Sequence, residues 1–253
     1  MKSPTIEAVI QRRLLINYRV DPDVVEPLLP APFRPQLVHG HAVAGICLLS
    51  LTELRPRGLP RWVGVHSQNV AHRFAVEWDT PDGLGQGVYI PRRDSGSLLN
   101  VIVGGRAFPG RHHRARFIVA ETDSEFDITF QSTDRWAGAH VQARLDAALN
   151  GSVLFADNND ASRFFEDGSI GYSDSSDPSK VEGVHLVTNA WQVQPLTLSA
   201  VTSTYFDDPA RFPPGSATLD CGLLMRNVPV TWEPVAPLQV RRRDTAEARP
   251  SDG

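Results

Sequence analysis

The chain has 253 residues, a net charge of −4 at pH 7 and a hydrophobic fraction of 41%, values that are ordinary for a soluble globular protein. The absence of a basic excess argues against a nucleic acid as a standing partner. No apolar run approaches the roughly 20 residues that a membrane span needs, and the N-terminus lacks the apolar core of a signal peptide, so we predict a cytoplasmic protein that does not enter a membrane.

The N-terminal third alternates apolar runs with turns rich in proline and glycine. Residues 14–20 and 41–51 are apolar and are predicted to form strands. Between them, Asp21 and Pro22 have the residue types of a helix N-cap and a first helical position. The helix that they begin is expected to end at Pro30. This order favours a β-rich fold with few helices.

Strand patterns dominate the middle of the chain. The clearest lies over residues 125–132, where Phe126, Ile128 and Phe130 alternate with polar residues. This alternation predicts a strand with one buried face and one solvated face. Further strands are expected at residues 70–78, 87–90, 98–103 and 116–120.

The C-terminal half contains weaker patterns. A short helix is predicted over residues 160–166, with Asp160 as its N-cap. Residues 171–179 are polar and are predicted to form a hairpin tip or a loop. Residues 184–193 and 196–206 are predicted to form two long strands.

Neither an internal repeat nor a long linker divides the sequence. We therefore predict one domain over residues 1–237, followed by a polar, disordered tail over residues 238–253. The fold class is mainly β, and α+β at most. Cys47 and Cys221 lie in apolar surroundings and are predicted to be buried free thiols.

The segment 104–116 is rich in arginine and histidine and follows one of the predicted strands. Arginine binds carboxylates through two parallel hydrogen bonds, and imidazole exchanges protons near neutral pH. The segment therefore predicts a pocket for a small organic anion. Because side chains alternate along a strand, at most one of His112 and His113 is expected to face such a pocket. The alternative is a solvated loop after a glycine turn.

Other kinds of site are disfavoured by spacing. His39 and His41 would share one face of an extended chain, which suits a metal ion, but no third ligand lies nearby in the sequence, and we favour exposed loop histidines. The acidic run 157–160 lacks the spacing of a calcium-binding loop. No dinucleotide or phosphate-binding glycine motif is present. We therefore predict neither a metal nor a cofactor.

Several segments, taken in order, resemble the acetoacetate decarboxylase-like superfamily, and the chain is most similar to its DUF2071 branch. These segments are residues 18–21, 28–33, 64–68, 105–114 and 219–229. The resemblance implies a cone-shaped β-barrel with a flanking antiparallel sheet, a few short helices and an internal pocket. It also allows a homo-oligomer.

The same resemblance shows where this chain departs from the decarboxylases, in which a lysine forms an imine with the substrate. His113 lies at the position of that lysine, Arg114 at that of its lysine neighbour, and Gln68 at that of a pocket glutamate. Because imidazole forms no stable imine, acetoacetate decarboxylase activity is expected to be absent. The only lysines of the chain, Lys2 and Lys180, are poorly placed to replace it.

Two functions remain open at this point. The first is a lysine-independent acid/base enzyme, a lyase, hydratase or cyclase that acts on a small keto or hydroxy acid. The second is a non-catalytic protein that binds a small ligand. For the enzyme, His113 is predicted to carry the proton. The residues predicted to bind the substrate are Arg106, Arg114, Gln68, His66 and Tyr89.

Overall fold

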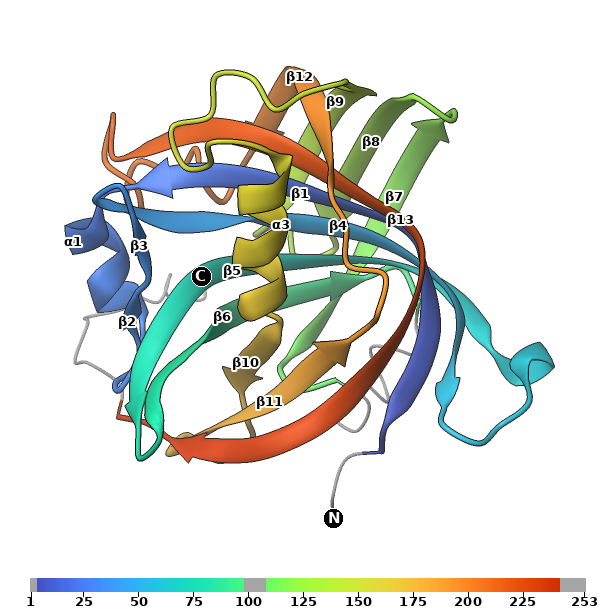
Figure 1. Cartoon of the computed structure of the whole chain (residues 1–253), viewed down its shortest axis with the longest axis horizontal. Coiled ribbons are helices and arrows are strands. Elements are labelled where there is room, and N and C mark those ends of the chain that lie inside the picture. The colour runs from blue at the N-terminus through green and yellow to red at the C-terminus, as the bar shows by residue number, and fades with distance from the viewer. Residues whose placement is uncertain (1–3, 98–107, 242–253) are drawn as a thin grey trace, which may run out of the picture.

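Long apolar and alternating runs make this chain a mainly β protein with few short helices, as predicted. The computed structural model describes residues 4–97 and 108–241 (Figure 1). The strands are β1 (Ile6–Val20), β2 (Arg34–Pro35), β3 (Leu37–Val38), β4 (His41–Pro56), β5 (Val65–Thr80), β6 (Gly83–Ser95), β7 (His112–Glu121), β8 (Glu125–Ser132), β9 (Gly138–Leu145), β10 (Ile170–Asp174), β11 (Lys180–Val187), β12 (Gln194–Ser203) and β13 (Ala217–Gln239). The helical segments are α1 (Pro22–Val25), α3 (Asn158–Asp167) and the 3-10 turns η1 (Glu26–Leu28) and η2 (Arg61–Val63).

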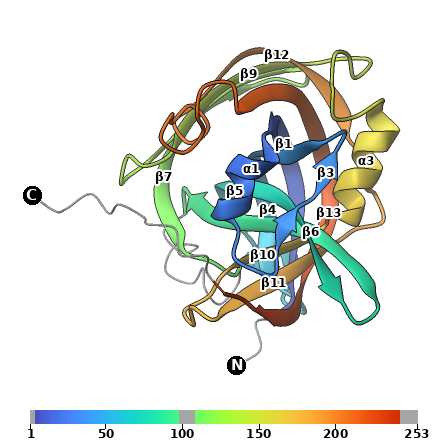
Figure 2. The same ribbon diagram turned by 90° about the vertical axis from the view of Figure 1, so that its left-hand side faces the viewer.

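The described strands form one large mixed sheet whose pairing closes into rings. The neighbouring strands β13, β1, β4, β5 and β6 are common to two of these rings. β10 and β11 close one ring between β6 and β13, and β7, β8, β9 and β12 close the other. Figure 2 shows β9 and β12 on the side opposite to β10 and β11. The barrel expected from the resemblance is therefore present as ring-like pairing, not as a single regular barrel.

The shared strands bury both of their faces. In β1, Leu14 and Ile16 belong to one hydrophobic cluster, whereas Leu15 belongs to a second cluster on the opposite face. This division follows from the alternation of side chains along a strand. The second cluster also contains Cys47 of β4 and Phe165 of α3. The helix α3 thus covers the face of the shared strands that carries Cys47 (Figure 1).

The start of the predicted N-terminal helix is confirmed. The carboxylate of Asp21 accepts a hydrogen bond from the backbone N–H of Asp23 at 3.0 Å, and Pro22 is the first helical residue. The α-helical part is one turn long, and η1 continues it. None of the described helices is long and apolar enough to cross a membrane.

The predicted N-cap of the second helix is wrong. Asp160 lies inside α3, and the cap is Asp157, whose Oδ1 accepts from the backbone N–H groups of Asn159 and Asp160 at 2.8 Å each. All four residues in the run 157–160 are competent caps by type alone. Their order in the chain therefore could not be decided from composition.

The other differences concern strands. Part of the predicted loop 171–179 is β10, which pairs with β6 and β11, and the strand predicted over 184–193 ends at Val187. β9 and β13 were not predicted, and β13 continues past the predicted domain boundary to Gln239. The predicted strand 98–103 lies outside the described residues.

Candidate functional site

A cavity of about 100 Å³ borders the face of the shared strands that α3 covers. Three arginines from three strands contribute to its lining, Arg13 of β1, Arg73 of β5 and Arg93 of β6. Cys47 of β4 and His112 of β7 also contribute. The rest of the lining is largely apolar and includes the indole rings of Trp191 and Trp232.

Strand register explains why these side chains meet. Cys47 pairs with Ala71 of β5, Ala71 pairs with Arg93 of β6, and Arg93 pairs with His112 of β7. Residues paired across neighbouring strands point to the same face of a sheet. Arg73 follows Ala71 by two residues and so shares that face. One transverse row of the sheet therefore places Cys47, Arg93 and His112 on the cavity side, and Arg73 lies next to this row.

Arg73 is the most deeply buried of the three arginines, at 1% exposure. Its Nε donates to the Sγ of Cys47 at 3.1 Å, and its Nη2 donates to the Oδ1 of Asn17. The guanidinium carbon lies 4.6 Å from the ring centroid of Phe165, which is a cation–π contact. Its Nη1 has no hydrogen-bond partner among the described residues. Burial lowers the pKa of this guanidinium.

Arg13 and Arg93 approach the cavity from either side. Arg13 Nη2 lies 3.8 Å from the Cys47 Sγ, and its guanidinium carbon lies 5.7 Å from the centroid of the Trp191 ring. Arg93 Nε donates to the backbone oxygen of Pro109 at 2.9 Å, and burial lowers the pKa of Arg93 to about 10.

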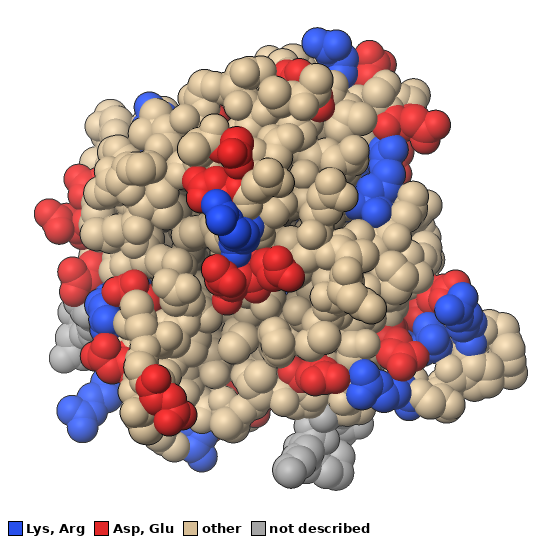
Figure 3. All heavy atoms as spheres, in the orientation of Figure 1, with Lys and Arg blue, Asp and Glu red and all other residues tan. Residues whose placement is uncertain are grey.

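None of these three arginines forms an ion pair with a carboxylate of the described residues. Asp94 borders the cavity, but its carboxylate binds Arg92 at 2.8 Å. On the face of the molecule that carries α3, basic and acidic side chains are interspersed (Figure 3). The uncompensated positive charge is therefore internal and does not belong to a basic surface patch on that face.

The thiol of Cys47 is affected by these charges. Burial alone would raise its pKa, but the Arg73 and Arg13 guanidiniums outweigh this effect and lower the pKa of Cys47. The other free thiol, Cys221, has no such arginine partner among the described residues, and burial together with Asp220 raises its pKa to about 12. Both cysteines are buried and free, as predicted.

His112 presents a neutral imidazole to the cavity. Burial and the charge of Arg93 lower the pKa of His112 to about 4. Its Nε2 lies 3.3 Å from the backbone oxygen of Phe108 and must donate there, since a carbonyl oxygen can only accept. Nδ1 is then an acceptor, and it is buried with no partner among the described residues.

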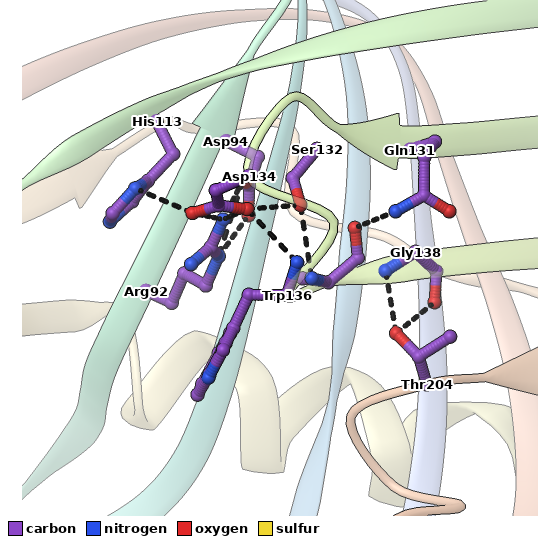
Figure 4. Close-up of polar contacts among 10 residues, drawn as sticks. Arg92, Asp94, His113, Gln131, Ser132, Asp134, Trp136, Gly138 and Thr204 are labelled. Atoms are coloured by element: carbon purple, nitrogen blue, oxygen red, sulfur yellow. Dashed lines mark hydrogen bonds and ion pairs between the residues drawn. The ribbon is translucent and has the colours of Figure 1, made fainter. Parts of the chain in front are cut away.

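His113 lies on the opposite face of β7, in a separate ion-pair cluster (Figure 4). Its Nδ1 is 3.2 Å from Asp134 Oδ2, and Asp134 also accepts from Arg92 at 2.9 Å and from Ser132 at 2.6 Å. Arg92 in turn binds Asp94 through two nitrogens. Burial and the Arg92 charge lower the pKa of His113. The register that places His112 beside Arg93 places His113 beside Asp94.

The predicted substrate-binding residues do not converge. Gln68 accepts a hydrogen bond from Arg12 at 2.7 Å and donates to Ser50 Oγ at 3.1 Å, and His66 Nε2 lies 3.1 Å from the same hydroxyl. Gln68 and His66 thus meet at Ser50, whereas neither contributes to the cavity lining. Because Arg12 alternates with Arg13 along β1, this network lies on the face of β1 opposite to the cavity.

The remaining predicted residues lie elsewhere. Tyr89 is buried, and its hydroxyl donates to Asp174 Oδ1 at 2.8 Å. Arg114 is exposed on β7. Arg106 lies outside the described residues. Among those residues, no three His, Cys, Asp or Glu side chains come together as metal ligands, so His39 and His41 lack a third ligand there.

The cavity lining includes three arginines, one thiol and one imidazole. Sequence reasoning missed the arginines and the thiol as site residues, and it favoured His113, the neighbour of the imidazole residue His112. A usable signal was present for two of the missed residues. Arg13 and Arg73 each lie inside strongly apolar strand sequence, where a charged residue is unusual. Which face each of them occupies depends on pairing between strands that are distant in the sequence.

The family model of DUF2071, described as an uncharacterized conserved protein, matches residues 7–219 of the chain. This span includes the strands that contribute the arginines, the thiol and the imidazole of the cavity. No curated protein matches the sequence.

Solved structures share the fold at low sequence identity. Acetoacetate decarboxylase from Legionella pneumophila subsp. pneumophila str. Philadelphia 1 has a TM-score of 0.57 at 9% identity, over 92% of this chain and 88% of that one. The enduracididine biosynthesis enzyme MppR complexed with pyruvate has a TM-score of 0.57 at 12% identity, over 94% and 91%. An acetoacetate decarboxylase-like enzyme from Sphingomonas wittichii RW1 has a TM-score of 0.55 at 11% identity, over 94% and 93%.

Proposed function

We propose that this chain, which belongs to the DUF2071 family and has the acetoacetate decarboxylase-like fold, binds a small organic carboxylate in its arginine-lined cavity. One observation carries the proposal: Arg13, Arg73 and Arg93 line one cavity without a carboxylate partner in the described residues. The relative MppR is complexed with pyruvate, a small keto acid, and this supports the same ligand class here.

The physical argument starts from the cost of burying charge. A buried cation is unfavourable unless an anion or a set of hydrogen-bond acceptors replaces its water. The guanidinium of Arg73 keeps one unpartnered nitrogen, and a carboxylate would satisfy it through paired hydrogen bonds. The indole rings of Trp191 and Trp232 would then enclose the carbon skeleton.

Imine chemistry has no support in this cavity. Lys180 is the one lysine within the described residues, and it lies at the start of β11, where its Nζ is 3.2 Å from Asp177. It does not border the cavity. For the catalytic version of the function we therefore propose chemistry that does not use a lysine.

A proton-transfer reaction is the catalytic version of the proposal. The unprotonated Nδ1 of His112 favours it, and we place the proton-carrying role on His112 instead of His113. A bound carboxylate would add negative charge near the imidazole and raise its pKa, which strengthens the base. The substrate would then be a keto or hydroxy acid that loses a proton from carbon. A binding protein without catalysis would use the same cavity.

Calorimetric titration with pyruvate and with lactate, supported by thermal unfolding, tests the binding. A ligand at 100 times its Kd adds about 2.7 kcal/mol to the free energy of unfolding. Arg13→Gln is the informative variant, since Arg13 is only partly buried, and loss of a charge-assisted hydrogen bond is expected to weaken binding roughly tenfold or more. Arg57→Gln, at an exposed arginine away from the cavity, is the control.

Binding of neither acid, or equal binding by Arg13→Gln and the wild type, would contradict the proposal. Exchange of the pyruvate methyl protons with deuterium, followed by NMR, distinguishes the two versions. Exchange that is lost in His112→Phe indicates an enzyme, and binding without exchange indicates a binding protein.

A further inference from the structure

We infer that the Sγ of Cys47 is a nucleophile that adds to the β-carbon of an α,β-unsaturated carboxylate held by Arg73 and Arg13. This inference rests on the proposed function, because it needs a carboxylate in the same cavity. It goes beyond that function in assigning a covalent step and a narrower ligand class.

The geometry around the sulfur carries the inference. Cys47 is 3% exposed and lines the cavity. Arg73 Nε donates to the sulfur at 3.1 Å, and Arg13 Nη2 points to it from 3.8 Å. Two cationic donors directed at one sulfur match a thiolate, since a neutral thiol is a weak acceptor. The lowered pKa of Cys47 agrees with this arrangement.

A second observation points to a ligand beside the sulfur. The guanidinium that contacts the sulfur through Nε has its Nη1 buried and without a hydrogen-bond partner among the described residues. A carboxylate on Nη1 would therefore be held by the same guanidinium group that contacts the Cys47 Sγ. In an α,β-unsaturated carboxylate, the β-carbon lies two bonds beyond the carboxyl carbon, which gives it reach from the carboxylate toward the sulfur.

The step is balanced without a further reactant. The thiolate forms an S–C bond at the β-carbon, and the π electrons of the double bond move to the α-carbon. The proton that the thiol gave up returns to the α-carbon, and the unpartnered Nδ1 of His112 on the same cavity can carry it. No oxidant or reductant takes part, and the adduct contains the whole ligand.

A structural role for Cys47 is the competing explanation, in which the sulfur only fills space in the core, as buried cysteines often do. That role predicts slow reaction with any electrophile and no preference for an anionic one. Cys221 provides an internal comparison, since it is equally buried but its pKa is raised.

The test compares acrylate with acrylamide on the full chain at pH 7, with the rate at each cysteine followed by peptide mass spectrometry. Free thiols react faster with acrylamide, because the carboxylate of acrylate is repelled by the thiolate and deactivates the double bond. At Cys47 we expect the opposite order, with acrylate faster by roughly tenfold, the contribution of one charge-assisted hydrogen bond. Cys221 should react slowly with both.

Arg13→Gln should lower the acrylate rate at Cys47 more than the acrylamide rate, because Arg13 stabilises the thiolate for both reagents but holds a carboxylate only in acrylate. Cys47→Ser should abolish the adduct, and Cys221→Ala should keep it. A faster reaction with acrylamide at Cys47, equal labelling of both cysteines, or no labelling of Cys47 in the wild type would each overturn the inference. If pyruvate binds while one of these results is obtained, the proposed function stands and only the covalent step fails.

Discussion

The buried arginines of this protein differ in whether a carboxylate accompanies them. Arg92 is 6% exposed and binds both Asp94 and Asp134. Arg73 is 1% exposed and has a thiol, an amide oxygen and an aromatic ring as neighbours, without a carboxylate among the described residues. Removal of a partner from a buried ion pair leaves a charge behind, whereas removal of an unpaired charge relieves a desolvation cost.

This contrast predicts different effects of the same substitution. Arg73→Met should change the free energy of unfolding of the ligand-free protein by less than about 1 kcal/mol, because relief of the buried charge offsets the lost hydrogen bonds to Asn17 and Cys47, and it should abolish carboxylate binding. Arg92→Met should lower the free energy of unfolding by roughly 3 kcal/mol, because it leaves Asp94 and Asp134 unpaired. Urea unfolding of both variants measures the two values. Equal destabilisation would mean that Arg73 is structural.

From the sequence, the residues that line the cavity could be predicted only as pairs of adjacent residues, without a decision on which member of each pair faces the cavity. The segment that contains His112 and His113 was predicted to line a pocket, and strand alternation limited the prediction to one of the two. The register between β6 and β7 decides in favour of His112. That register depends on residues that are distant in the sequence, as does the choice between Arg12 and Arg13. The local residue pattern carries no information on this register or on that choice.

At the scale of elements, α3 connects helix capping with the cavity. Phe165 of α3 packs against the guanidinium of Arg73, and Gly168 and Ser169 after the helix contribute to the cavity lining. The helix is ten residues long, so its isolated stability is marginal and depends on the cap and on packing.

Asp157→Ala should therefore lower the free energy of unfolding by ~1 kcal/mol, since two backbone N–H groups lose their acceptor. Asp160→Asn is the matched control, because this residue keeps its acceptor oxygen for the backbone N–H of Ala156. It should change the free energy of unfolding by less than about 0.5 kcal/mol. Urea unfolding gives both values. An unchanged free energy of unfolding in Asp157→Ala would contradict the assignment of Asp157 as the cap.

The strand β13 shows why one element escaped prediction. It contains Pro229, Pro234 and Pro237, and proline within a run argues against a strand because it has no N–H to donate. β13 pairs with β1 at Pro229 and with β11 at Pro234, and Pro237 lies at an irregularity in the pairing with β11. The absent N–H groups of these prolines therefore break no hydrogen bonds to a second neighbouring strand. Such one-sided pairing cannot be deduced from the sequence of β13 itself.

At the scale of the whole molecule, the fold class follows from the local residue pattern, whereas the site depends on how strands that are distant in the sequence pair with one another. Alternation and turn residues are enough to indicate a mainly β chain, and four of the family-like segments lie within the span that the DUF2071 model matches. The two faces of the shared strands, one with the cavity and the other with a large apolar cluster, arise only when the rings close. Closure of the rings also covers histidine side chains on both faces of the shared strands.

His72 is buried on one face of the shared strands, opposite to the face of the cavity, where His112 is half-buried. His72 is 0% exposed, its ring lies 4.4 Å from that of Tyr205, and burial with the charges of Arg92 and Arg211 lowers its pKa to about 3. In the unfolded chain a histidine protonates below about pH 6.5. Between that pH and the folded pKa the unfolded state binds more protons, so the free energy of unfolding falls as the pH falls.

We therefore expect stability to decrease from pH 6.5 to pH 5, and His72→Phe to reduce the slope by about 1.4 kcal/mol per pH unit. Phenylalanine keeps the ring contact and cannot take up a proton. Tyr205→Phe is the control and should keep the wild-type slope, because burial raises the pKa of Tyr205 to about 12, far above this range. Urea unfolding at three pH values within this window measures the slopes. An unchanged slope in His72→Phe would mean that His72 takes up its proton in the folded protein as readily as in the unfolded chain.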